Sequence, residues 1–161
     1  MKTFNYTLNN QPLDFLINFD NFKDEKNILI QIFCGDKKEV LENLLKTLTK
    51  KLPHAICIGA STDGEINDKE ITTLKTVISI SVFEKTTLKI KALQEETSFL
   101  NGVKLAQELS QEDTKLIITF TDGAITNGEE FLNGITSIND SVTICGGMAG
   151  DNAHFTQTFI S

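Results

Sequence analysis

Short apolar runs separated by amphipathic stretches extend along most of the chain. Runs of this length with few polar residues are typical of strands that are buried on both faces. They occupy residues 28–34, 55–59, 116–120 and 142–145. A stretch with helical spacing of apolar residues lies between the first two runs, and another lies between the last two. The pattern therefore predicts two β-α-β units, each with parallel strands.

The sequence also predicts where the helices begin and which faces they bury. Asp36 and Glu39 stand three residues apart, as in a capping box, before a helix that ends near Leu52. A helix begins at Thr97 or Ser98, and another is capped by Asn127 with Glu130 three residues later. The predicted inner faces comprise Val40, Leu41, Leu44, Leu45 and Leu48, then Val103, Ala106 and Leu109, then Phe131, Leu132, Ile135 and Ile138.

The remaining segments complete the predicted fold. Residues 1–26 are mostly polar, with a short helix expected over 11–20. Residues 77–83 and 88–93 alternate around a turn, which predicts an antiparallel hairpin, and residues 154–160 alternate as a last strand. We therefore expect an α/β fold: one mixed β-sheet with two β-α-β units, an antiparallel hairpin and helices packed on it, forming a single domain over residues 1–161.

An internal repeat is visible in the sequence. A shift of 87 residues carries Phe33 onto Phe120 and Gly59 onto Gly146 without a gap. The same shift relates Glu42 to Glu129, Leu45 to Leu132, Leu48 to Ile135 and Gly64 to Asp151. Each half reads as strand, helix, strand, and then a loop that carries glycine and an acid. Duplication and chance similarity between two β-α-β units both account for the match.

Charge and composition narrow the possible partners. The net charge is −7 and the isoelectric point is near 4.8, which argues against nucleic acid or an anionic membrane as a partner. All 15 basic residues are lysine, so no guanidinium fork is present to hold a carboxylate or phosphate. The three cysteines are scattered in apolar runs, and the N-terminus lacks the apolar core of a signal peptide. A soluble cytoplasmic protein without a metal or cofactor is expected.

Loops after the predicted parallel strands carry the candidate chemistry. Ligands of open α/β sheets bind beyond the carboxyl ends of such strands. Four segments are expected there, at residues 34–36, 61–65, 121–124 and 146–151. Glycine permits close approach of the backbone, so such loops can surround a small ligand with main-chain donors. Glycines that serve only tight turns are the alternative explanation.

The sequence gives less support for other kinds of site. The glycine loops lack the lysine and the following helix that phosphate-binding loops need. Cys34 and Ser61 are candidate nucleophiles, and the imidazole bases available are His54 and His154; a Cys34–His154 pair is conceivable. A cluster of carboxylates could hold a cation or perform acid–base chemistry, unless these acids are simply solvated. Its members would be Asp63, Glu65, Asp122 and Asp151.

Three motifs in this order resemble one known family. They are IGASTDGEI at residues 58–66, FTDG at 120–123 with Asn127-Gly128 shortly after, and GGMAGD at 146–151. Together they are similar to the FIST N-terminal domain over about residues 28–160. The resemblance implies a sensory module of bacterial signal-transduction proteins that binds small molecules such as amino acids. The positions that match the family motifs and would contact or shape a ligand site are Ser61, Thr62, Gly64, Glu65, Asp122, Gly146, Gly147, Ala149, Gly150 and Asp151.

The resemblance also implies partners. Members of the family usually continue into a C-terminal FIST half or an output signalling domain, so the chain is expected to be truncated relative to them. Its last strand would then be an exposed edge that invites homodimer formation. Two other function classes remain open at this point: a small-molecule hydrolase or transferase using Cys34 or Ser61, and a scaffold that only mediates protein contacts.

Overall fold

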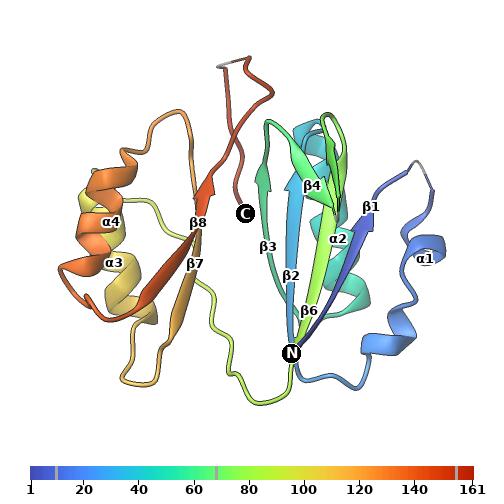
Figure 1. Cartoon of the computed structure of the whole chain (residues 1–161), viewed down its shortest axis with the longest axis horizontal. Coiled ribbons are helices and arrows are strands. Elements are labelled where there is room, and N and C mark those ends of the chain that lie inside the picture. Colours follow the sequence, from blue (N-terminus) through green and yellow to red (C-terminus); the bar gives the residue numbers. More distant parts are fainter. Residues whose placement is uncertain (10, 68, 155) are drawn as a thin grey trace. The chain divides into compact units, whose positions relative to one another are not determined.

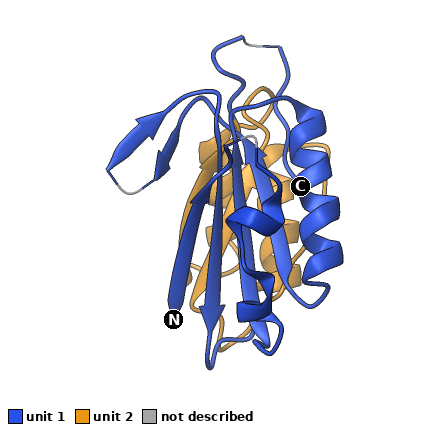
Figure 2. Ribbon diagram, turned by 90° about the vertical axis from the view of Figure 1, so that its right-hand side faces the viewer, with its two compact units in different colours: residues 1–88, 150–161 blue, residues 89–149 orange. Residues whose placement is uncertain are grey.

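The computed structural model describes residues 1–9, 11–67, 69–154 and 156–161. These residues form two compact units, shown in different colours in Figure 2. The first unit contains Met1–Leu88 together with Gly150–Ser161, and the second contains Lys89–Ala149. The single domain expected over residues 1–161 stays a prediction.

The first unit is built on a mixed four-stranded sheet with the order β1-β6-β2-β3 (Figure 1). Strands β2 and β3 are parallel, whereas β6 is antiparallel to both of its neighbours. The predicted α/β class with a mixed sheet is therefore confirmed. The elements of this unit are β1 (Lys2–Thr7), α1 (Leu13–Leu16), the 3-10 helix η1 (Phe19–Phe22), β2 (Asn27–Cys34), α2 (Lys38–Lys51), β3 (Ile56–Ser61), β4 (Glu65–Asn67), β5 (Glu70–Thr72) and β6 (Thr76–Phe83).

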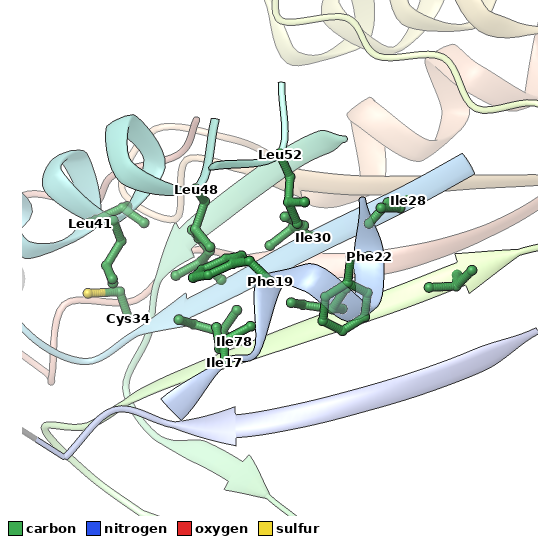
Figure 3. Close-up of a cluster of buried hydrophobic side chains, with 14 residues drawn as sticks. Ile17, Phe19, Phe22, Ile28, Ile30, Cys34, Leu41, Leu48, Leu52 and Ile78 are labelled. Atoms are coloured by element: carbon green, nitrogen blue, oxygen red, sulfur yellow. The ribbon is translucent and has the colours of Figure 1, made fainter. Parts of the chain in front are cut away.

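One face of this sheet carries the main hydrophobic core (Figure 3). Helix α2 buries Leu41, Leu44 and Leu48 at helical spacing, as the sequence predicts. These leucines pack over the side chains that β2 and β6 direct to the same face, and aromatic residues of η1 close the cluster. Burying each such side chain contributes about 1.5–3 kcal/mol. The core thus holds α2 and the N-terminal segment against the strands that carry the loops of interest.

Several elements of the first unit differ from the sequence-based expectations. Residues 2–7, expected to be part of a polar segment, form the edge strand β1, because their backbone pairs antiparallel with β6 from Lys2 to Thr7. Thr3 Oγ1 and Ser81 Oγ also form a hydrogen bond of 2.9 Å across this pair. Residues 88–93 are not a strand, so the predicted hairpin with 77–83 is wrong. Strand β6 instead fills the middle of the sheet, and the antiparallel hairpin is β4–β5.

Two smaller expectations are also corrected. Asp36 is not the N-cap of α2: Lys37 is, and no side chain caps it, because the Asp36 carboxylate accepts the Lys37 N–H instead (2.7 Å). The described residues of 154–160 form no strand. Only Ile160 bridges to Ala60, and the other residues follow a turn held by Asp151.

The second unit joins two helices to a two-stranded parallel sheet. Gly102 and Gly134 allow the helices to pack closely, because a Cβ on Gly102 would lie 2.9 Å from the Ile135 amide nitrogen and one on Gly134 would lie 2.9 Å from that of Val103. Asn127 caps α4 as predicted, and Thr97, one of the two predicted starts, caps α3. Leu105 is buried, whereas Leu132 and Ile138 are exposed, contrary to expectation. The elements are α3 (Ser98–Leu109), β7 (Leu116–Thr121), α4 (Gly128–Thr136) and β8 (Thr143–Met148).

The strand registers reproduce the sequence repeat. In the first unit Leu29 pairs with Ile56 and Cys34 pairs with Ser61. The shift of 87 residues carries these pairs onto Leu116 with Thr143 and Thr121 with Met148, which are the ends of the β7–β8 ladder. Even the hydrogen bond after each ladder repeats: Thr62 N donates to Cys34 O, and Ala149 N donates to Thr121 O. The structure therefore supports a repeated β-α-β unit over chance similarity.

Candidate functional site

Four loops of the first unit come together at the carboxyl ends of β2 and β3. We call residues 34–36, 61–65, 72–75 and 150–153 the loop cluster. Its members are joined directly: Gly35 N donates to Lys75 O (2.7 Å), and Asn152 Nδ2 donates to Gly35 O (3.0 Å). The cluster therefore lies where ligands of α/β sheets bind.

Glu65 is the buried centre of the loop cluster, with 1% of its surface exposed. Its Oε1 accepts the Thr62 hydroxyl at 2.6 Å, and its Oε2 accepts the Lys75 N–H at 3.2 Å. The Thr72 hydroxyl lies 3.5 Å from Oε2. A Cβ on Gly35 would overlap this carboxylate, so glycine is what lets the two loops meet. These contacts make Glu65 a brace between loops, since a buried carboxylate is stable only with such donors.

Ser61 ends β3 and is also buried, with all of its polar atoms engaged. Its N–H donates to Phe159 O (2.8 Å), and its carbonyl accepts the Gly150 N–H (2.9 Å). Its Oγ accepts the Phe159 N–H (2.9 Å). The serine hydroxyl and backbone thus hold the C-terminal segment on the edge of β3.

Asp63 and Asp151 organise the turn that closes the cluster. Asp63 is exposed, and its Oδ1 accepts the Ala153 N–H (3.2 Å). A Cβ on Gly150 would lie 2.5 Å from the Asp63 carboxylate, so a larger residue there would displace the Asp63 side chain. Asp151 Oδ2 accepts the N–H groups of Thr156 (2.6 Å) and Gln157 (3.1 Å). Both acids act on backbone amides, as short acidic side chains commonly do in turns.

Backbone strain gathers in the same loops. Leu74, Asn152 and Ala153 have positive φ angles of 57°, 56° and 60°. Among the described residues outside glycine, no others share this conformation. It is uncommon for asparagine and unfavourable for alanine or leucine. Strained residues persist where the surroundings over-determine them, and they concentrate at functional sites.

The residues expected to form the site fall in both units. The first unit brings together Ser61, Thr62, Gly64, Glu65, Gly150 and Asp151. The second unit contains the other four. Of these, Asp122 Oδ1 accepts the Ala124 N–H (2.8 Å) and Ala149 is buried. Gly146 has a φ of 141° and no room for a Cβ against Thr119, whereas Gly147 has open space.

Two contributors to the loop cluster, Asn152 and Lys75, were not predicted from the sequence, whereas Gly35 lies in the predicted segment 34–36. Asn152 directly follows the GGMAGD motif, and asparagine is the residue other than glycine that best tolerates the left-handed conformation. That position was therefore a usable signal. The Lys75 contribution is its backbone N–H, which no sequence pattern reveals.

Both candidate nucleophiles, Cys34 and Ser61, are buried. Burial raises the pKa of the Cys34 thiol, and Thr76 Oγ1 donates to its sulfur at 3.4 Å. A raised pKa lowers the fraction of the thiol that is present as thiolate, and the thiolate is the reactive form. His54 and His154 are exposed. In residues 1–9, 11–67, 69–154 and 156–161, no hydrogen bond between a histidine side chain and Cys34 or Ser61 is present.

The predicted carboxylate cluster is not assembled in the first unit. Glu65 points inward to Thr62 and Lys75, whereas Asp63 and Asp151 each hold a different stretch of backbone. Across the described ranges, no group of three or more His, Cys, Asp or Glu residues is arranged to hold a metal ion. The carboxylates are used to order the loops.

Comparison with known proteins agrees with the motifs. None of the helices in the described part of the chain is both long and apolar enough to cross a lipid bilayer. No significant match is found among curated proteins or solved structures. The family model for the FIST N domain matches residues 28–161, which include the loop cluster and both copies of the repeat. The chain thus belongs to the FIST N domain family, consistent with a sensory domain of signal transduction.

Proposed function

We propose that this chain is a bacterial sensory domain that binds a small polar ligand, such as an amino acid, at the loop cluster. The observation that carries the proposal is the meeting of the motif residues 61–65 and 150–151 at the carboxyl ends of β2 and β3. Main-chain groups, hydroxyls and an exposed acid surround this position, and the backbone there is strained. Such an arrangement suits recognition of a small polar molecule.

Asp63 is the residue best suited to bind an ammonium group. Glu65 is buried and already accepts from Thr62 and Lys75, so a cation at Glu65 would have to break these bonds. Asp63 is exposed, and a carboxylate has about four acceptor positions. Its bond to the Ala153 N–H therefore leaves capacity for an ammonium donor.

Binding without chemical conversion is part of the proposal. Cys34 is buried, its pKa is raised, and the Ser61 hydroxyl accepts the Phe159 N–H. A hydroxyl nucleophile needs a base within hydrogen-bond reach. The signal would therefore pass to an output partner as a change in shape or stability of the domain.

A thermal-shift screen tests the ligand. The twenty amino acids and a set of small polar metabolites would be added at concentrations up to about 10 mM. A ligand that binds the folded state raises Tm as its concentration rises. We expect at least one amino acid to do so, and Asp63→Asn to weaken that effect about tenfold or more.

Asp24→Asn is the matched control, because Asp24 is also exposed in the first unit but precedes β2, at the other end of that strand from the loop cluster. The control should respond like the unaltered chain. A screen in which no compound shifts Tm, or an effect that Asp63→Asn and Asp24→Asn change equally, would overturn the proposal.

A further inference from the structure

The C-terminal segment of the first unit crosses the edge of β3 and occupies the predicted ligand contacts. We call its described residues, 150–154 and 156–161, the strap. Gly59 and Ser161 exchange two backbone hydrogen bonds of 3.0 and 2.9 Å. Phe159 then bonds to the N–H and the hydroxyl of Ser61, and Gly150 bonds to its carbonyl. Every polar atom of Ser61 is therefore satisfied by the strap.

Hydrogen bonds rather than buried apolar surface hold the strap. None of its described residues is buried, and Phe159 alone among them packs against the hydrophobic core. The Phe159 ring is partly exposed, and Lys38 Nζ lies 5.2 Å from its centre. The neighbouring strands β2 and β6 instead bury Ile30, Ile78 and other large side chains. A segment with few buried contacts opens at a lower free energy than the core.

The strap also carries strain that opening would release. Asn152 and Ala153 are consecutive residues with positive φ, and His154 N bonds back to Asp151 O at 3.3 Å, in the manner of a type I′ turn. This turn is held on the cluster by the bonds of Asn152 to Gly35 and of Ala153 to Asp63. The closed position therefore depends on a small set of polar contacts to the loops that would bind the ligand.

We infer that the strap is a reversible cover of the sensory site: it opens independently of the sheet, and opening frees the polar groups of Ser61 and Asp63. The inference rests on the proposed function, since those residues belong to the proposed site. A ligand that uses Ser61 competes with Phe159 and Gly150 of the strap. Binding and strap release are then coupled, as linkage requires of two events that share one set of contacts.

Amide hydrogen exchange of the whole chain without ligand tests the inference. The amides of Gly59, Ser61 and Phe159 should exchange about 100-fold faster than those of Ile30 and Ile32, because the strap lacks a buried core. Ser61→Ala removes the hydroxyl that accepts the Phe159 N–H and should speed strap exchange about fivefold, as expected for one hydrogen bond. Exchange of the β2 amides should not change.

Ala153→Gly supplies the opposite change. Glycine adopts positive φ without penalty, so it should slow strap exchange about fivefold while leaving β2 unaffected. Ser81→Ala is the control, because it deletes a serine hydroxyl bonded to Thr3 at the other side of the sheet. Equal exchange of strap and β2 amides, or parallel changes of both in Ala153→Gly, would show that the strap opens only together with the sheet. Either result would overturn the inference. Neither result depends on finding a ligand.

Discussion

The two repeats of this chain share the same strand register and differ in the side chains at the end of the second strand. In both, the same strand register is followed by the same hydrogen bond across the strand ends. The first repeat closes with Ser61, which is 5% exposed, whereas its counterpart in the second is Met148, which is 49% exposed. The shared register is backbone geometry, and the difference lies in the side chains and in what covers them.

The contact between helix and strand also differs between the two repeats. In the first repeat Leu41 of α2 packs on Gly59, where a Cβ would lie 2.9 Å from the leucine Cδ1. The counterpart of Leu41 is Gly128, which faces the sulfur of Met148 instead. The strand counterpart of Gly59 is Gly146, so the large side chain that meets the helix in the second repeat stands two positions further along the strand.

The end of the second repeat also contributes to the loop cluster of the first unit. Asn152, the counterpart of Glu65, bonds to Gly35, the residue against which Glu65 packs. The GGMAGD motif therefore belongs to both units: Ala149 bonds within the second and Gly150 within the first. The first repeat therefore supplies the polar site, and the end of the second repeat supplies residues that close it.

The largest effect is expected from removing the brace. Glu65→Ala leaves the Lys75 N–H and the Thr62 hydroxyl without their acceptor in a buried position, so the first unit should lose about 3 kcal/mol of unfolding free energy. Asn152→Ala, at the counterpart position, removes one bond and should cost about 1 kcal/mol. Urea titration monitored by Tyr6, the single tyrosine of the chain, reports on this unit. Equal losses would contradict the assignment of Glu65 as a brace.

A glycine pair tests how closely the loops approach. Gly35→Ala would push a Cβ into the Glu65 carboxylate and within 3.0 Å of the Leu74 nitrogen, so we expect a loss of about 2 kcal/mol. Gly147→Ala in the second repeat meets open space and should change stability by less than about 0.5 kcal/mol. Urea titration of both variants, followed by circular dichroism, measures the difference. A tolerated Gly35→Ala would show that the loops are not in contact.

Exchanging the counterpart residues tests whether the polar site belongs to the first repeat. Ser61→Met removes the acceptor for Phe159 and should cost about 1 kcal/mol, because the strap can move away from the larger side chain. Met148→Ser alters a half-exposed position and should cost less than about 0.5 kcal/mol. Thermal unfolding of the two variants gives the comparison. Similar changes in Tm would mean that the two positions are equivalent.

Chemical labelling of the native cysteines compares the two repeats without any substitution. Cys34 and Cys57 of the first repeat have thiols whose pKa burial raises, whereas Cys145 of the second repeat is exposed. Labelling with a maleimide at neutral pH should therefore modify Cys145 at least about 100-fold faster than the other two. Mass spectrometry of the peptides identifies the order. Rapid labelling of Cys34 in the folded chain would show that the core next to the loop cluster opens easily.

Sequence patterns predicted the parts of the fold that local physics determines. The apolar runs of β2, β3 and β7 are visible because strands covered on both faces have few polar residues, and the leucine stripe of α2 is visible because burial of one helix face imposes a period. The cap Asn127 followed from side-chain chemistry alone, and the same chemistry limited the cap of α3 to Thr97 or Ser98. Strand β1 was missed because its residues are mostly exposed and polar, and only pairing with β6 makes them a strand.

The candidate site was predicted in part for the same reason. Glycine beside an acid after a strand indicated residues 34–36, 61–65 and 150–151, which lie in the loop cluster, and the cluster includes six of the ten residues expected to form the site. The segment 72–75 was not indicated by this pattern. Their roles were not predictable. Glu65 reads from sequence as a free ligand contact, but in the structure it is buried between loops that are distant in the chain.

The sequence by itself determined the two β-α-β units, the repeat and the family. Hydrophobic periodicity and turn residues act over a few positions, so a linear pattern records them. The tertiary structure alone decided that β6 lies between β1 and β2, that Glu65 is a brace and that the strap occupies Ser61. These features depend on hydrogen bonds between residues far apart in the chain, up to 117 positions for Asn152 and Gly35, and the partner of a buried polar group is chosen by the whole fold.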